Sequence, residues 1–207
     1  MIGKPLNGLY LLHYTGVDPQ TGQYTYEDKN HDGVITNNYG PTGDVYFKKI
    51  APSFATGFGF NFDLNGFNLS LFFSVKKQVG VNAFAQTNIA GSLANQPVEV
   101  LNRWQKPGDI TNVGKFSTMS AQDPNGYLGN SDIGYTDASY IRLQNLSLSY
   151  NLPAAYVKKA GMQSFSLFVH ANNILLITDY KGLDPEVQSF GALPPSRTIV
   201  GGVSINF

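Results

Sequence analysis

Two alternating runs of apolar and polar residues, joined by Asn65 and Gly66, constrain the fold of this chain more than any other feature. An Asn-Gly pair between two such runs is the strongest short-range hairpin signal. A period of two places alternate side chains on opposite faces of a strand. One face of the predicted hairpin is apolar, and it carries Phe54, Phe58, Phe60, Phe62 and Leu64 in the first run and Phe67, Leu69, Leu71, Phe73 and Val75 in the second.

The two predicted strands, residues 53–64 and 67–76, are long enough to cross a lipid bilayer. A tilted strand needs about 9 to 11 residues to do so, whereas an ordinary strand has about 5 to 6. Weaker alternation predicts four more strands, at residues 6–14, 139–152, 164–171 and 198–207. The sequence therefore predicts six long strands.

The connections between these strands alternate between short and long. The Asn-Gly turn and residues 153–163 are short, whereas residues 15–52, 77–138 and 172–196 are long, with a short helix predicted at residues 97–104. Outer-membrane barrels have short periplasmic turns and long extracellular loops. We therefore predict an all-β fold of long antiparallel strands that belong to a transmembrane β-barrel.

Composition and motifs exclude several classes of function. The 14 basic and 14 acidic residues balance and form no basic cluster, which argues against a nucleic-acid partner. The chain has no cysteine, and His13, His31 and His170 lie in different segments. Neither a nucleophile elbow nor a zinc-protease motif occurs. We therefore predict no enzymatic activity and no catalytic residue.

Residues 28–34 match the first half of a calcium-binding loop. Asp28, Asn30 and Asp32 provide side-chain oxygens at the first, third and fifth positions, a glycine follows, and the Val34 carbonyl would be a further ligand. The twelfth position is Tyr39, where an EF-hand has a glutamate, so an ion would need another ligand from elsewhere. These four residues are a candidate calcium site, and the alternative is a solvated turn rich in Asp and Asn.

Several segments resemble the C-terminal part of the SusC/RagA family of TonB-dependent outer-membrane transporters. The resemblance rests on residues 103–109 (RWQKPGD), 137–153 (DASYIRLQNLSLSYNLP) and 178–186 (TDYKGLDPE), together with the turn at residues 28–33, Ser131-Asp132, Asn172-Asn173 and the terminal Phe207. These segments span nearly the whole chain in the order found in the family.

The resemblance implies a fold, a location and partners. The family's barrel has about 22 strands around a plug, lies in the lipid of the bacterial outer membrane, and imports large nutrients, usually oligosaccharides or peptides. A SusD-like lipoprotein covers it, and the TonB complex supplies energy. By this resemblance, residues 1–207 would be a C-terminal, antiparallel segment of the transmembrane β-barrel with about six to eight long strands. The plug, the TonB-contacting segment and the N-terminal strands would lie outside it. The resemblance also implies that the assembly machinery recognises Phe207, but it identifies no substrate-binding residue.

Two alternatives remain open at this point. The first is a secreted β-sandwich that binds carbohydrate through loop aromatics such as Trp104, Tyr127 and Tyr135. The second is a small self-contained outer-membrane barrel of about eight strands. A continuous uncovered apolar band about 25 Å tall would indicate a membrane protein, whereas a second sheet over that face would indicate a sandwich.

Overall fold

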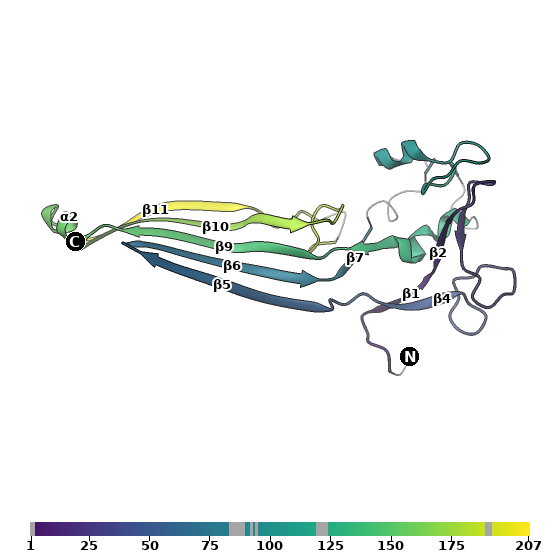
Figure 1. Ribbon diagram of the computed structural model, residues 1–207, viewed down its shortest axis with the longest axis horizontal. Helices are drawn as coiled ribbons and strands as arrows, with labels where there is room; N and C mark the ends of the chain where they lie inside the picture. The colour runs from purple at the N-terminus through teal and green to yellow at the C-terminus, as the bar shows by residue number, and fades with distance from the viewer. Residues whose placement is uncertain (1–2, 83–89, 92, 94, 119–123, 189–191) are drawn as a thin grey trace. The chain divides into compact units, whose positions relative to one another are not determined.

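The computed structural model describes residues 3–82, 90–91, 93, 95–118, 124–188 and 192–207 (Figure 1). The chain divides into two compact units. Unit 1 comprises Met1–Ala51, Val79–Asp137 and Gln188–Phe190, and unit 2 comprises Pro52–Gln78, Ala138–Val187 and Gly191–Phe207.

Unit 2 is a five-stranded antiparallel sheet in the order β11-β10-β9-β6-β5 (Figure 1). Its strands are β5 (Phe54–Leu64), β6 (Phe67–Lys77), β9 (Tyr140–Asn151), β10 (Ser164–Thr178) and β11 (Thr198–Asn206). Between β5 and β6, Asn65 and Gly66 have φ angles of 48° and 89°. A two-residue hairpin turn needs positive φ at both positions, which glycine and asparagine adopt most readily. The hairpin prediction is confirmed.

Strand register places most of the apolar residues of the five strands on one face of the sheet. One row runs across the sheet through Phe62, Leu69, Leu148, Val169 and Gly201. The exposed fraction is 56% for Phe62 and 39% for both Leu148 and Val169. No described strand of unit 2 forms a second layer over this face, whereas a sandwich would bury it. The uncovered band therefore favours a lipid-facing barrel wall.

The short connections lie together at one end of this sheet. Asn151 N–H, at the end of β9, donates to the Gly66 carbonyl at 2.8 Å. Ser164, at the start of β10, pairs with Asn206 at the end of β11. The predicted alternation of short and long connections is thus confirmed for the strands of unit 2.

The link from β9 to β10 contains a short helix, α2 (Ala154–Lys159), which the sequence interpretation missed. Pro153 precedes the helix, and two lysines lie in its last turn, where positive charge is favourable. Val157 is its buried anchor, with 1% of its surface exposed. Among the described residues, no helix has both the length and the apolar character needed to span a membrane.

Unit 1 consists of short strand pairs and turns of 3-10 helix. Its three two-stranded sheets pair β1 with β4, β2 with β3 and β7 with β8. The bounds are β1 (Gly8–Leu12), β2 (Tyr14–Val17), β3 (Tyr24–Tyr26), β4 (Val45–Lys49), β7 (Val79–Val81), β8 (Tyr135–Asp137), η1 (Val98–Asn102), η2 (Pro124–Asn130) and η3 (Asp132–Gly134).

Two elements of unit 1 differ from the elements that the sequence predicts. The long strand predicted at residues 6–14 is instead β1 and β2, which separate at His13 and pair with different partners. The apolar run in residues 9–12 already departs from strict alternation, so the period of two was weak there. The helix predicted at residues 97–104 is the shorter η1, and Pro97 caps it rather than beginning it.

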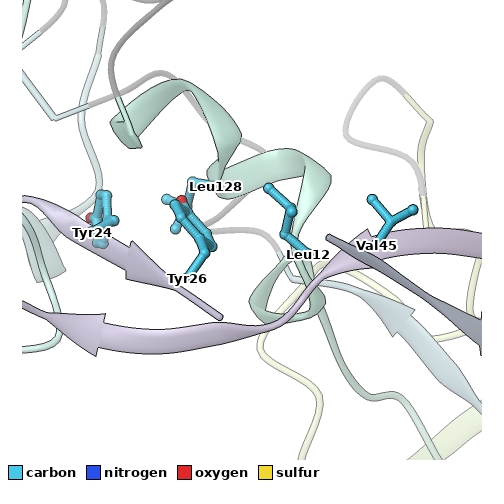
Figure 2. Close-up of a cluster of buried hydrophobic side chains, with 5 residues drawn as sticks. All are labelled: Leu12, Tyr24, Tyr26, Val45 and Leu128. Carbon is cyan, nitrogen blue, oxygen red and sulfur yellow. The ribbon is translucent and has the colours of Figure 1, made fainter. Parts of the chain in front are cut away.

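Figure 2 shows the main core of unit 1, a cluster of five side chains that are each at most 8% exposed. The members are Leu12, Tyr24, Tyr26, Val45 and Leu128. They come from β1, β3, β4 and η2, so this cluster joins segments that are far apart in the sequence. Tyr127 adds an edge-on ring contact to Tyr26, with centroids 6.1 Å apart.

Candidate functional site

The predicted calcium loop follows β3 in unit 1 and is closed by its own side chains. Asp28 Oδ2 accepts the Gly33 N–H at 2.8 Å, Asn30 Oδ1 accepts the Asp32 N–H at 3.1 Å, and Asp32 Oδ1 accepts the Val34 N–H at 2.8 Å. Gly33 has a φ of 83°, a conformation that favours glycine and permits the tight bend. The predicted ligand residues thus lie in one compact turn.

One carboxylate oxygen of this loop has no donor. Asp28 Oδ1 is buried and makes no hydrogen bond, which costs free energy unless a partner is supplied. A calcium ion takes oxygen ligands and would satisfy this atom. The described residues contain no group of three or more His, Cys, Asp or Glu that could hold a metal ion. Ligands beyond Asp28 and Asp32 would therefore be the Asn30 amide and the Val34 carbonyl.

Asp44, which the sequence interpretation missed, is fully buried and ties the ends of this loop together. Its Oδ1 accepts the Lys29 N–H at 2.9 Å, and its Oδ2 accepts the Thr36 N–H at 2.7 Å. Burial raises the pKa of Asp44, but the N–H groups of Thr36, Lys29 and Asn30 outweigh it and hold the pKa below its usual value. No spacing rule marks Asp44, because it lies beyond the twelve-residue loop.

A cavity of about 390 Å³ lies over the β1–β4 ribbon in unit 1. It is lined by Leu11, His13, Glu27, Tyr46, Phe47, Lys48 and Asp132. His13 Nδ1 lies 2.7 Å from Asp132 Oδ2, and the other Asp132 oxygen accepts the Tyr14 N–H at 3.0 Å. The sequence could not reveal this pair, because its two members are 119 residues apart.

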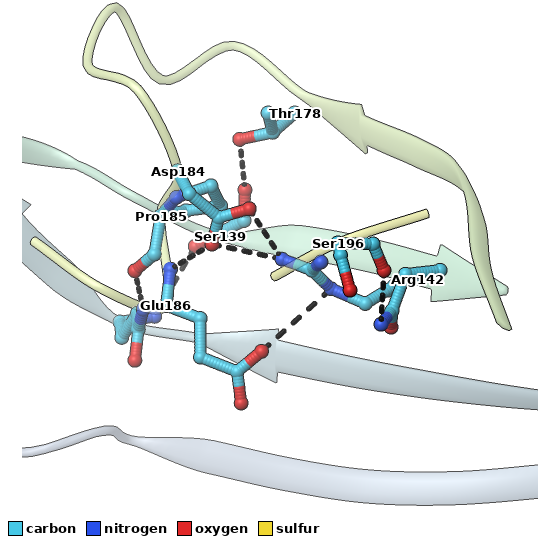
Figure 3. Close-up of polar contacts among 9 residues, drawn as sticks. Ser139, Arg142, Thr178, Asp184, Pro185, Glu186 and Ser196 are labelled. Carbon is cyan, nitrogen blue, oxygen red and sulfur yellow. Dashed lines mark hydrogen bonds and ion pairs between the residues drawn. The ribbon is translucent and has the colours of Figure 1, made fainter. Parts of the chain in front are cut away.

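Unit 2 contains a buried ion pair near the start of β9 (Figure 3). Arg142 Nη2 lies 2.8 Å from each carboxylate oxygen of Asp184, and Arg142 Nε lies 3.7 Å from Glu186 Oε2. The side chains of Arg142 and Asp184 are 5% and 4% exposed. Gln78 Nε2 donates to the carbonyl of Pro185, the next residue. These contacts hold residues 184–186 against β9 and the end of β6.

Arg142 reaches the polar side of the sheet because β9 contains a bulge. Asn145 pairs with Phe72 of β6, but the next β6 residue, Phe73, pairs with Leu143, so Gln144 is an extra residue. Leu146 therefore shares the apolar face with Leu143, although their spacing is odd. A one-residue shift reverses the face of every following side chain, and Arg142 consequently lies opposite to where the Leu146 pattern alone would place it.

The remaining predicted residues are not members of these sites. Phe207 follows β11 and is 81% exposed, and its role in assembly stays a prediction. Trp104 Nε1 donates to the Pro19 carbonyl at 2.8 Å, and its ring contacts Gly22 so closely that a Cβ there would overlap it. The packing of Trp104 and Tyr127 supports a structural role for these loop aromatics.

Known proteins align with most of this chain, although no protein-family model matches it. TonB-dependent receptor P3 of Formosa agariphila is 28% identical over 239 residues, which cover 99% of the chain. TonB-dependent receptor P39 of the same organism is 31% identical over 184 residues and covers 85% of the chain. The chain is homologous to TonB-dependent receptors. It spans only 22% and 16% of the length of these two relatives.

Solved transporter structures agree with this homology. The RagAB peptide importer in its open-open state matches 96% of the chain with a TM-score of 0.75 and 26% identity. A second structure, of the RagAB peptide transporter, matches 98% with a TM-score of 0.76 and 25% identity. The chain covers 22% and 25% of those chains. These relatives confirm the predicted SusC/RagA resemblance, the barrel-segment fold and the outer-membrane location.

Proposed function

We propose that this chain is a C-terminal barrel segment of a TonB-dependent transporter that imports oligosaccharides or peptides across the outer membrane. The observation that carries the proposal is the five-stranded sheet with one uncovered apolar face, together with its likeness to the RagAB importer. The role needs no catalytic residue. A SusD-like lipoprotein at the cell surface and the TonB complex are the partners that this function requires.

The edges of the sheet support a larger barrel. Among the described strands of the sheet, β5 pairs only with β6, and β11 pairs only with β10. An unpaired strand edge in lipid leaves backbone N–H and C=O groups unsatisfied, at several kcal/mol for each group. Further strands must therefore continue the sheet at both edges. The other described strands have only three to five residues, whereas a strand needs about 9 to 11 to cross a bilayer. This argues against the small self-contained barrel of about eight strands.

The genomic sequence upstream of Met1 tests the proposal directly. We expect a continuous reading frame that encodes the missing strands and a plug domain. A stop codon followed by a signal peptide would contradict the proposal. Deletion of the whole gene should also reduce growth on oligosaccharides or on peptides, and affinity purification of the receptor should recover a surface lipoprotein.

Calcium binding by residues 28–34 is a second proposed property, favoured by the buried and unpartnered Asp28 Oδ1. Titration calorimetry with calcium should give a binding isotherm for the wild-type protein and none for Asp32→Ala. Asp18→Ala is a matched control, because Asp18 also accepts bonds within an exposed turn, from Gln20 N–H and Thr21 Oγ1. Identical traces for wild type and Asp32→Ala would remove the idea.

A further inference from the structure

We propose that the cavity over the β1–β4 ribbon is a subsite for a neutral sugar unit. The inference rests on the proposed role in nutrient uptake, and it names the chemistry of one contact with the nutrient. The cavity, of about 390 Å³, is within the usual size range of small-ligand sites, which combine apolar surface with a few convergent polar groups. Leu11 and the ring of Tyr46 supply apolar surface.

The acceptors in this cavity are fixed in place by neighbouring groups. Asp132 binds His13 Nδ1 at 2.7 Å, which places the proton of the neutral imidazole on Nδ1 and leaves Nε2 as an acceptor. The Tyr46 hydroxyl hydrogen-bonds to Glu27, which raises the pKa of Tyr46. The backbone N–H of Glu27 donates to the His13 carbonyl at 2.9 Å. Glu27 and His13 are therefore held next to each other as two acceptors.

The cavity also contains a donor. Lys48 lines it and is half-buried. Its ammonium group makes no hydrogen bond or ion pair with another residue in the part of the chain that the structure describes. A sugar hydroxyl donates one hydrogen bond and accepts others. Adjacent hydroxyls of one ring can therefore donate to Glu27 and His13 while they accept from Lys48.

The balance of charge favours a neutral ligand over a charged one. The lining contains the carboxylates of Glu27 and Asp132 and the ammonium of Lys48. Lys29 is not part of the lining, but its Nζ lies 4.8 Å from the ring centroid of Tyr46. These four charges sum to zero. A cationic ligand would be repelled by Lys48, and an anionic one by Glu27. Side-chain exposures of 52% for His13 and 28% for Asp132 leave the site open to solvent.

Binding experiments on the purified full-length receptor that contains residues 1–207, in detergent, would test this subsite. The probes are neutral disaccharides, disaccharides of uronic acids, and the dipeptides diglycine and dilysine. We expect saturable binding of at least one neutral disaccharide. Glu27→Gln and Lys48→Met should each weaken it about tenfold or more, because each removes a hydrogen bond to a charged group. Lys48→Arg, which keeps the donors, should retain most of the affinity.

Lys49→Met is the matched control, because Lys49 is the next residue of β4 and does not line the cavity. It should bind the same disaccharide as tightly as the wild-type protein. Equal loss in Lys48→Met and Lys49→Met, no binding of any neutral disaccharide, or tighter binding of a dipeptide would overturn the inference. Uptake is not measured in this assay. A chain that binds sugar in a Lys48-dependent way but does not support growth would contradict only the proposed transport function.

Discussion

Arg142 and Asp184 form a buried two-bond ion pair, with Arg142 Nη2 at 2.8 Å from both carboxylate oxygens. The two residues are 42 positions apart, so the pair fastens a turn of a long connection onto β9. Asp184 Oδ1 also accepts the Glu186 N–H at 2.9 Å. The turn and the strand therefore share one polar network.

Removal of Arg142 should destabilise unit 2 strongly. Arg142→Met leaves the Asp184 carboxylate buried without its partner, a change that typically costs about 3–5 kcal/mol. Urea unfolding in detergent, monitored by far-ultraviolet circular dichroism, measures the free energy of unfolding. Glu186→Gln is the control, since Glu186 is 47% exposed and 3.7 Å from Arg142 Nε, and it should cost less than about 1 kcal/mol. Equal losses in the two variants would contradict the prediction.

Two adjacent glycines of β11 should respond differently to alanine. A Cβ on Gly202 would overlap the ring of Phe168 on β10, whereas the nearest atom to a Cβ on Gly201 is the Phe168 carbonyl oxygen at 3.8 Å. Gly202→Ala should therefore destabilise the sheet by about 1–3 kcal/mol through overpacking. Gly201→Ala should be close to neutral, and the same unfolding assay compares them. A larger loss for Gly201→Ala would refute this account of the Phe168 contact.

Asp44 should make the stability of unit 1 depend on pH in the acid range. Burial raises the pKa of Asp44, but donated N–H bonds hold it below the usual value, which is about 3.9 in an unfolded chain. The contribution of Asp44 is thus present above pH of about 4 and is lost as pH falls through the folded pKa. The free energy of unfolding should be measured from about pH 7 to about pH 3. It should fall less on acidification for Asp44→Asn than for the wild-type protein. Parallel pH profiles for the two proteins would contradict this.

The terminal aromatic residue should matter for assembly and much less for stability. Phe207 is 81% exposed and follows the last strand, so little packing is lost when it is changed. If the assembly machinery recognises it, Phe207→Ala should lower the amount of receptor in the outer membrane. Phe207→Tyr should preserve that amount, because the ring is kept. Membrane fractionation with immunodetection gives the measurement, and equal amounts for wild type and Phe207→Ala would remove the assembly role.

The sequence predicted best those features that depend on residues close together in the chain. The β5–β6 hairpin follows from a period of two and from the φ requirement of Asn65 and Gly66, both of which are local. Strand direction, the apolar face and the alternation of connections were predictable for the same reason. The SusC/RagA resemblance then supplied the larger barrel, which no pattern in 207 residues could specify.

What the sequence could not show depends on contacts between distant segments. His13 pairs with Asp132, and Arg142 pairs with Asp184, at separations of 119 and 42 residues. Asp44 cannot be distinguished from other polar loop residues by sequence, because its role depends on the backbone N–H groups of Lys29 and Thr36. The division of residues 6–14 into β1 and β2 likewise depends on the partners β4 and β3, which lie far along the chain.

The bulge at Gln144 makes the number of residues in β9 as consequential as their identity. On either side of it the strand follows opposite parities, with odd numbers toward the apolar face before Gln144 and even numbers after it. A substitution of Gln144 keeps this change of parity, whereas deletion of the residue removes it. The guanidinium of Arg142 would then point to the apolar face, and its ion pair with Asp184 would be lost. The chain is thus more sensitive here to the loss of one residue than to its replacement.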